Sequence, residues 1–156
     1  MLFNRVNGKC QFMVVKSSFL SVRQKQVFDF INSRTDAKVF YHSCGSVYDL
    51  IPEAIEIGVD ILNPVQTSAA KMDLEVLKRQ FGKDISFLGS GIDVQQKLPY
   101  YSLSEIEGEV KRTLDIMAPS GGFVFFPSHN IQANVTADRI DCMFRTVLDN
   151  RSYQAK

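Results

Sequence analysis

A strand-like apolar segment followed by a helix-like amphipathic segment occurs four times in succession along this chain. The apolar segments are residues 38–41, 59–62, 85–88 and 122–126, and the amphipathic segments are 47–55, 74–81, 106–117 and 140–148. Such alternation favours parallel strands, because each helix returns the chain to the starting edge of the sheet. We therefore predict an α/β fold with about four parallel strands alternating with helices and joined by right-handed crossovers.

Local signals mark the ends of several of these helices. Asp73 stands where a helix N-cap is expected, and Gly82 follows the last apolar turn of the same helix. Ser102 and Glu105 have the spacing of a capping box at the start of the next helix. A further helical segment, 24–32, precedes the first strand.

Composition excludes several functional classes. Lys and Arg total 18 against 17 Asp and Glu, so no basic excess is available to neutralise the phosphates of a nucleic acid. No apolar run approaches the roughly 18 residues of a membrane span. Three widely spaced cysteines, Cys10, Cys44 and Cys142, do not form a disulfide framework. We expect a cytoplasmic protein without nucleic-acid or membrane partners, in which residues 1–22 form one strand or a loosely docked arm and not a signal peptide.

Polar side chains gather where each predicted strand ends, which is where parallel α/β folds bind their ligands. They are His42, Ser43 and Cys44 after the first strand, Asn63 and Gln66 after the second, Ser90 and Asp93 after the third, and Ser128, His129 and Asn130 after the fourth. Turns also favour Ser, Asn and Asp, so most of these residues have a purely structural alternative. The chain has only two histidines, and both follow strands directly.

His42 and Cys44 stand two residues apart, so on an extended segment their side chains point to the same side. Imidazole nitrogen and thiolate sulfur are ligands that zinc prefers, and a catalytic zinc has three protein ligands plus an open position. His129, at a neighbouring strand end, is the candidate third ligand. Such a zinc ion would hold a thiol substrate as its nucleophilic thiolate. The alternative is that Cys44 is a small buried apolar residue and His42 a hydrogen-bonded core residue.

Asp93 follows a short glycine-containing segment, and two interpretations of it stay open. The carboxylate is either a general base or a group that fixes the loop through hydrogen bonds to backbone amides. Gly89 and Gly91 permit positive φ or the close approach of a ligand. The segment lacks the spacing of a dinucleotide-binding fingerprint, so no nucleotide cofactor is predicted.

Four motifs occur in order along the chain: His42-Ser43-Cys44-Gly45, Ile61-Leu62-Asn63-Pro64-Val65-Gln66, Gly91-Ile92-Asp93 and Pro127-Ser128-His129-Asn130-Ile131-Gln132. Together they resemble the uroporphyrinogen decarboxylase superfamily, and most closely its cobalamin-dependent methyltransferase-like branch. That superfamily folds as a (β/α)8 barrel of roughly 250 residues with its site at the carboxyl face. The resemblance implies that residues 23–156 form the carboxyl-terminal half of such a barrel, and that 1–22 are a non-family leader or a truncation scar.

The resemblance also implies roles for individual residues. In the methyltransferase branch, a His-x-Cys motif and a later cysteine bind zinc, which activates a thiol such as coenzyme M. His42 and Cys44 match the first two ligands, and His129, which is also a competent zinc ligand, stands where the later cysteine is expected. In the decarboxylase branch, the motif that contains His129 lies at the tetrapyrrole-binding cleft. The essential aspartate of that branch belongs to the amino-terminal half of the barrel, so Asp93 does not correspond to it.

Three hypotheses follow. The leading one is zinc-dependent methyl transfer to a thiol from a corrinoid carried on a partner protein. Its predicted residues are His42, Cys44 and His129 as zinc ligands, His129 and Asp93 as catalytic residues, and Asn63, Gln66, Ser128 and Asn130 as substrate-binding residues. Asn63, Gln66 and Asp93 are expected to orient either the substrate or the zinc ligands.

The second hypothesis is cofactor-free decarboxylation of uroporphyrinogen III in porphyrin (haem) biosynthesis, with His129 binding a carboxylate or donating a proton. The absence of an arginine cluster at the strand ends weighs against it. The third is a non-catalytic half-barrel that pairs with an amino-terminal half or with a second copy, because four strands leave two open edges. Barrel sites draw on several strands, so the half-barrel alone is expected to lack independent catalysis.

Overall fold

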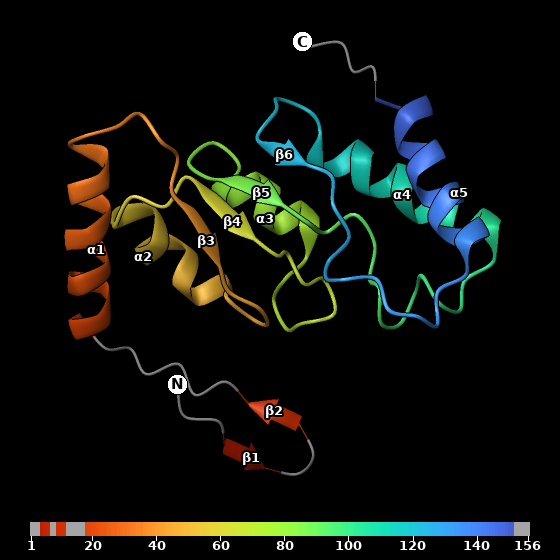
Figure 1. Cartoon of the computed structure of the whole chain (residues 1–156), viewed down its shortest axis with the longest axis horizontal. Helices are drawn as coiled ribbons and strands as arrows, with labels where there is room; N and C mark the ends of the chain where they lie inside the picture. Colours follow the sequence, from red (N-terminus) through yellow and green to blue (C-terminus); the bar gives the residue numbers. More distant parts are fainter. Residues whose placement is uncertain (1–3, 7–8, 12–17, 152–156) are drawn as a thin grey trace.

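Four short parallel strands form the central sheet of the computed structural model, which describes residues 4–6, 9–11 and 18–151 (Figure 1). The strands are β3 (Phe40–His42), β4 (Ile61–Asn63), β5 (Ser86–Leu88) and β6 (Phe123–Val124). They pair in the order β3-β4-β5-β6, and every neighbouring pair is parallel. The predicted α/β class with four parallel strands is confirmed.

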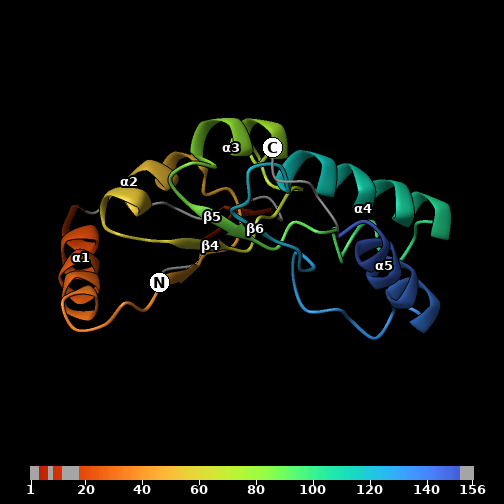
Figure 2. The same ribbon diagram turned by 90° about the horizontal axis from the view of Figure 1, so that it is seen from above.

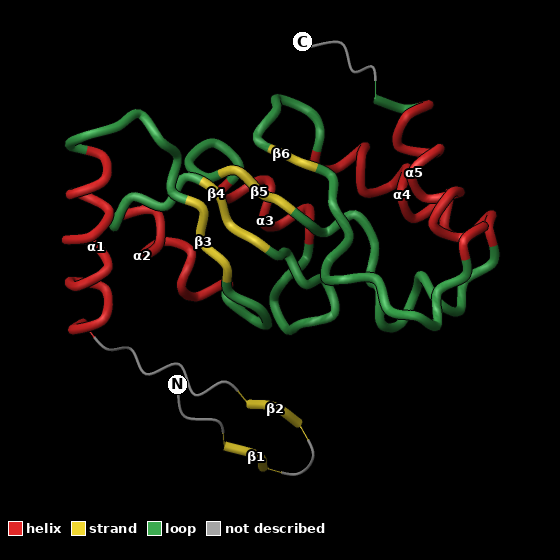
Figure 3. The backbone as a smooth tube through the Cα atoms, viewed as in Figure 1, coloured by secondary structure: helices red, strands yellow, loops and turns green. Residues whose placement is uncertain are grey.

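Helices precede, connect and follow these strands (Figures 1 and 3). They are α1 (Ser18–Asn32) before β3, the 3₁₀ turn η1 (Tyr48–Leu50) and α2 (Ile51–Glu56) after β3, α3 (Leu74–Phe81) after β4, α4 (Leu103–Met117) after β5 and α5 (Ala137–Asp149) after β6. An antiparallel hairpin of β1 (Asn4–Val6) and β2 (Lys9–Gln11) precedes α1. Within the described ranges, no helix has the length and apolar character needed to cross a membrane.

The predicted capping residues are in place. Asp73 accepts a hydrogen bond from the Val76 N–H at 3.0 Å, and Gly82 is the C-cap of the same helix, α3. Ser102 and Glu105 form the reciprocal capping box at the start of α4. These side chains satisfy backbone groups that a helix end leaves without partners, which fixes where α3 and α4 begin.

Two helices differ from the prediction at their starts. The segment 47–55 is divided into η1 and α2, because Pro52 has no N–H with which to continue an α-helical pattern back to the carbonyl of Tyr48. Helix α1 begins at residue 18 and not at 24, so it crosses the predicted boundary at residue 22. Half of the segment 1–22, namely residues 1–3, 7–8 and 12–17, lies outside the described residues, and the nature of the segment stays a prediction.

One face of the sheet packs against helices. The register aligns Tyr41, Leu62, Phe87 and Phe123 in one row across the four strands. Leu62 and Phe87 are buried, and all four side chains belong to an apolar cluster that also includes residues of α2 and α3. Figure 2 shows α2, α3 and α4 on this side of the sheet. Burial of this row supplies the main hydrophobic stabilisation of the sheet.

The opposite face of the sheet is open among the described residues. Phe40, Val124 and Phe126 are 50%, 51% and 49% exposed, although they are large apolar side chains. Val124 points away from the helix-covered row because side chains alternate along a strand, and Phe126 follows two residues after it, beyond the end of β6. The outer strands, β3 and β6, each have one neighbour within the sheet. This is the arrangement of half of a (β/α)8 barrel, with the interior face exposed and both edge strands paired on one side only among the described residues.

Asp60 is expected to make the folded state less stable in acid. Its carboxylate accepts the Val39 N–H at 2.8 Å and the Lys38 ammonium at 3.0 Å. The Val39 hydrogen bond, helped by Lys38, lowers the pKa of Asp60 from its ordinary value of 3.8. Since the folded pKa is the lower one, the stabilisation is present above about pH 4 and is lost as the pH falls through the folded pKa.

The Asp60→Asn variant should therefore show a flatter acid limb in the free energy of unfolding. Urea melts across about pH 2 to 6 measure it. An acid limb identical to that of the wild type would contradict the role given to Asp60.

Candidate functional site

The carboxyl ends of the strands lie at one edge of the sheet, which brings predicted site residues together. His42 lies opposite Asn63 in the register of β3 and β4. The segments beyond β5 and β6 are also joined, since the Ser128 N–H donates to the Ile92 carbonyl at 3.1 Å. Residues far apart in the sequence are thus held side by side, as expected for a parallel sheet.

A pocket of about 190 Å³ opens at this edge. Its lining residues are Cys44, Gln66, Ser68, Asp93, Gln95, Ser128 and His129. Five of these were predicted from the sequence, whereas Ser68 and Gln95 were missed because polar residues in loops carry no distinguishing signal. His42, Asn63 and Asn130 are not part of the lining. The pocket therefore draws on the segments that follow all four strands.

His42, Cys44 and Asn63 form a connected chain of polar contacts. Asn63 Oδ1 lies 2.7 Å from His42 Nδ1, and His42 Nε2 lies 3.3 Å from Cys44 Sγ. His42 is exposed and Cys44 is half-buried, so the alternative of two buried core residues does not apply. The predicted same-side placement of His42 and Cys44 is what the structure has. Thiol and imidazole are held where they can share a proton or a metal ion.

The geometry of this pair suits a zinc ion. Nitrogen and sulfur ligands on a tetrahedral zinc are about 3.5 Å apart, given Zn–N and Zn–S bonds of about 2.0 and 2.3 Å. The observed separation of His42 Nε2 and Cys44 Sγ, 3.3 Å, is close to that value. His129 lines the same pocket. No three His, Cys, Asp or Glu side chains form a ready metal-binding group within the described residues. The separation of His42 and Cys44 is thus compatible with zinc as well as with a hydrogen bond, whereas His129 is not grouped with them among the described residues.

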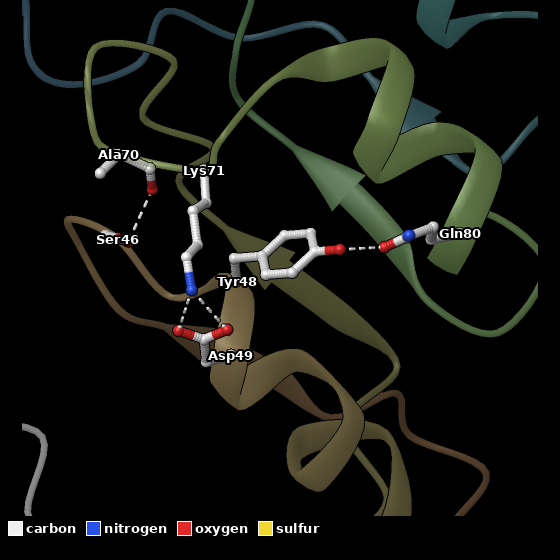
Figure 4. A network of polar contacts seen from close by, with 6 residues as sticks. All are labelled: Ser46, Tyr48, Asp49, Ala70, Lys71 and Gln80. Carbon is white, nitrogen blue, oxygen red and sulfur yellow. Dashed lines mark hydrogen bonds and ion pairs between the residues drawn. The ribbon is translucent and has the colours of Figure 1, made fainter.

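The loop between β4 and α3 is fastened to the segment that follows Cys44. The Gly45 N–H donates to Gln66 Oε1 at 3.1 Å, which connects the two pocket walls directly. Further contacts, drawn in Figure 4, run from Ser46 to the Ala70 carbonyl, from Lys71 to Asp49 and from Tyr48 to Gln80. Gln66 therefore uses its carbonyl oxygen to hold the backbone next to Cys44, which positions the pocket wall.

Asp93 and Ser128 both bind backbone amides. Asp93 is 5% exposed, and its Oδ1 accepts the N–H groups of Gln95 and Gln96 at 2.7 and 2.8 Å. Ser128 Oγ accepts the Val94 N–H at 3.4 Å. These contacts fix the loop after β5, as one of the two interpretations of Asp93 expects. The second oxygen of Asp93, Oδ2, takes no part in these contacts. The interpretation of Asp93 as a general base therefore stays a prediction.

The sequence model of the uroporphyrinogen decarboxylase (URO-D) family matches residues 18–149. This chain belongs to that family. The match covers all four strands of the sheet; it begins at the first residue of α1 and ends at the last residue of α5. No curated protein matches the chain. The resemblance inferred from the four motifs is confirmed at the level of the family, while the methyltransferase branch stays a prediction.

Membership of the URO-D family does not by itself choose a reaction, because one fold supports several chemistries. The chemical character of the pocket is therefore informative. Its lining contains one histidine, one cysteine and one carboxylate, together with hydroxyl and amide groups. Lysine and arginine are missing from the lining in the part of the chain that the structure describes.

Ser90 combines two unfavourable features at the end of β5. Its φ is 75°, a left-handed conformation that favours glycine, and its buried Oγ has no hydrogen-bond partner among the described residues. Each feature costs on the order of 1–3 kcal/mol. Ser90→Gly removes both and is expected to raise the free energy of unfolding by at least about 1 kcal/mol, after subtracting up to about 1 kcal/mol for the entropy of a new glycine.

Chemical denaturation of the Ser90→Gly variant measures this gain. Ser120→Gly is the matched control, because Ser120 also has a left-handed φ of 64° but is exposed, so a smaller gain is expected there. Equal changes in the two variants would show that the buried hydroxyl of Ser90 carries no penalty.

Proposed function

We propose that this domain transfers a methyl group from a corrinoid to a thiol with the help of zinc. The observation that supports it best is the pair of His42 Nε2 and Cys44 Sγ, 3.3 Å apart beside the pocket. His129 on the same pocket is the proposed third ligand, which leaves a fourth position for the sulfur of the substrate. Bound zinc would keep the thiol of the substrate deprotonated, as the thiolate, at neutral pH.

The remaining pocket residues suit a small polar thiol. Gln66, Ser68 and Gln95 offer amide and hydroxyl groups, and Asp93 offers a carboxylate. A corrinoid is far larger than a pocket of about 190 Å³. The corrinoid is therefore proposed to stay on a partner protein and to present only its methyl group at the mouth of the pocket.

Uroporphyrinogen decarboxylation is the alternative within the family, and the pocket supports it less well. Its substrate carries several carboxylates, which cationic side chains bind most strongly. The described pocket lining has no lysine or arginine, and its one carboxylate, that of Asp93, would repel such a substrate. His129 would be the main group available to bind a substrate carboxylate.

The open face of the sheet supports a second part of the proposal, a complementary half-barrel as partner. Phe40, Val124 and Phe126 are exposed on that face, and a closed barrel needs four more parallel strands. Figure 1 places α1 beyond β3 and α5 beyond β6, so each end of this half already carries a helix. If a second copy of this chain closed the barrel, two helices would meet at each junction between the copies. A partner half with fewer helices therefore fits better.

Native mass spectrometry of the chain after incubation with zinc and removal of loosely bound metal tests the proposal. About one zinc ion per chain is expected. The same protein is then mixed with methylcobalamin and a thiol, and in parallel with uroporphyrinogen. Because barrel sites draw on several strands, zinc content is the deciding measurement for this half-barrel alone, and efficient turnover is expected only with a complementary half. A thioether product supports methyl transfer. Release of CO₂ from uroporphyrinogen, or a folded chain without zinc, would reject the zinc-dependent methyltransferase.

A further inference from the structure

The side-chain amide of Asn63 bridges two strands from its place at the end of β4. Its Nδ2 donates to the Leu88 carbonyl of β5 at 3.1 Å, and its Oδ1 lies 2.7 Å from His42 Nδ1 of β3. Asn63 is 8% exposed and does not line the pocket. Both ends of the amide are therefore bonded within the protein.

These partners determine which nitrogen of His42 carries a proton. A backbone carbonyl only accepts hydrogen bonds, so the contact with Leu88 sets the orientation of the Asn63 amide. The end that faces His42 is then the carbonyl oxygen, which also only accepts. Nδ1 must donate, and in a neutral imidazole the lone pair is left on Nε2. Nε2 is the atom that contacts Cys44 Sγ.

We propose that Asn63 is a positioning residue that holds the His42 ring in its Nδ1–H tautomer and aims the Nε2 lone pair at Cys44. A histidine that binds a metal commonly donates its other ring N–H to such an acceptor, which fixes both the tautomer and the ring orientation. The consequence for zinc rests on the proposed function, whereas the tautomer itself requires no metal. Asn63 thereby acts through His42 and not through the substrate.

Long-range ¹H–¹⁵N correlation spectra of the full chain, prepared without metal, test this directly. The chain has only two histidines, and the spectrum of a His129→Gln variant assigns them. In the wild type, His42 Nδ1 is expected to be protonated and Nε2 unprotonated. Asn63→Leu keeps the branched shape at Cγ but has no acceptor, so the fixed Nδ1–H signature should be lost. Asn63→Asp keeps an acceptor and should retain a protonated Nδ1.

A His42 ring protonated only on Nε2 in the wild type overturns the inference, and so does an unchanged Nδ1–H in Asn63→Leu. The wild-type spectrum alone shows which nitrogen of His42 is protonated, even where a variant fails to fold. Thr146→Val is the matched control, because it removes a buried hydroxyl bonded to the Cys142 carbonyl within α5. A loss of the Nδ1–H signature in this control would attribute the effect to general destabilisation and overturn the specific role of Asn63.

Zinc titration of the same proteins separates this inference from the proposed function. Asn63→Leu is expected to bind zinc about 10–100-fold more weakly than the wild type. Equal affinities would overturn the effect of Asn63 on the metal site. A wild type that shows the expected tautomer but binds no zinc would reject the proposed zinc chemistry and leave the positioning role of Asn63 supported.

Discussion

Replacing Cys44 with alanine is expected to reduce the zinc content of the protein from about one ion per chain to none. Cys44 supplies the only sulfur ligand of the proposed site, and its Sγ lies 3.3 Å from His42 Nε2. Without the thiolate, two imidazole nitrogens remain, which are too few to retain zinc against a chelator. Native mass spectrometry or atomic absorption after gel filtration measures the change.

Cys142→Ala provides the matched control for this experiment. Cys142 is also half-buried, but it lies in α5, where its Sγ contacts the Leu103 carbonyl at 3.4 Å. That variant should keep the zinc content of the wild type. A full complement of zinc in Cys44→Ala, or the same loss in both variants, would contradict the assignment of Cys44 as a ligand.

The fold could be predicted from the sequence largely because each signal is local. Apolar segments of four or five residues marked the strands, and Asp73 and Ser102 marked helix starts through contacts with nearby backbone groups. The helix starts that were not predicted lie in segments where the spacing of apolar residues is not a sufficient guide. Pro52 divides a helix whose apolar spacing looked continuous, and α1 extends to residue 18 through a segment without a clear period.

The candidate site could be predicted less completely, because its geometry depends on contacts between strands. The spacing of His42 and Cys44 alone predicted that their side chains would lie together. The role of Asn63 could not be predicted in the same way. Its bonds to His42 and Leu88 exist only because the register aligns the ends of β3, β4 and β5. From the sequence, Asn63 was expected to orient either the substrate or the zinc ligands, and the structure favours the second role because both ends of its amide are bonded to protein groups, one of them His42.

Phe87→Ala is expected to destabilise the protein more than any other single change considered. Phe87 is 0% exposed in the middle of the sheet, between Leu62 of β4 and Phe123 of β6. Truncation of a buried phenylalanine removes apolar contacts and leaves a cavity, which costs about 3–5 kcal/mol. A domain of this size is stable by only about 5–15 kcal/mol, so the variant should melt far below the wild type. Urea denaturation followed by circular dichroism measures the loss.

Phe126→Ala is the matched control, and its result also reports on the open face of the sheet. Phe126 is 49% exposed in this chain, so truncation should cost well under the loss at Phe87 if the chain is alone in solution. A loss as large as that of Phe87→Ala, in a sample whose mass exceeds that of one chain, would mean that a partner buries Phe126. The pair of variants thus separates a core residue of the half-barrel from a residue that becomes core only when the barrel is closed. A small loss at Phe87 itself would contradict the packing described for the helix-covered face.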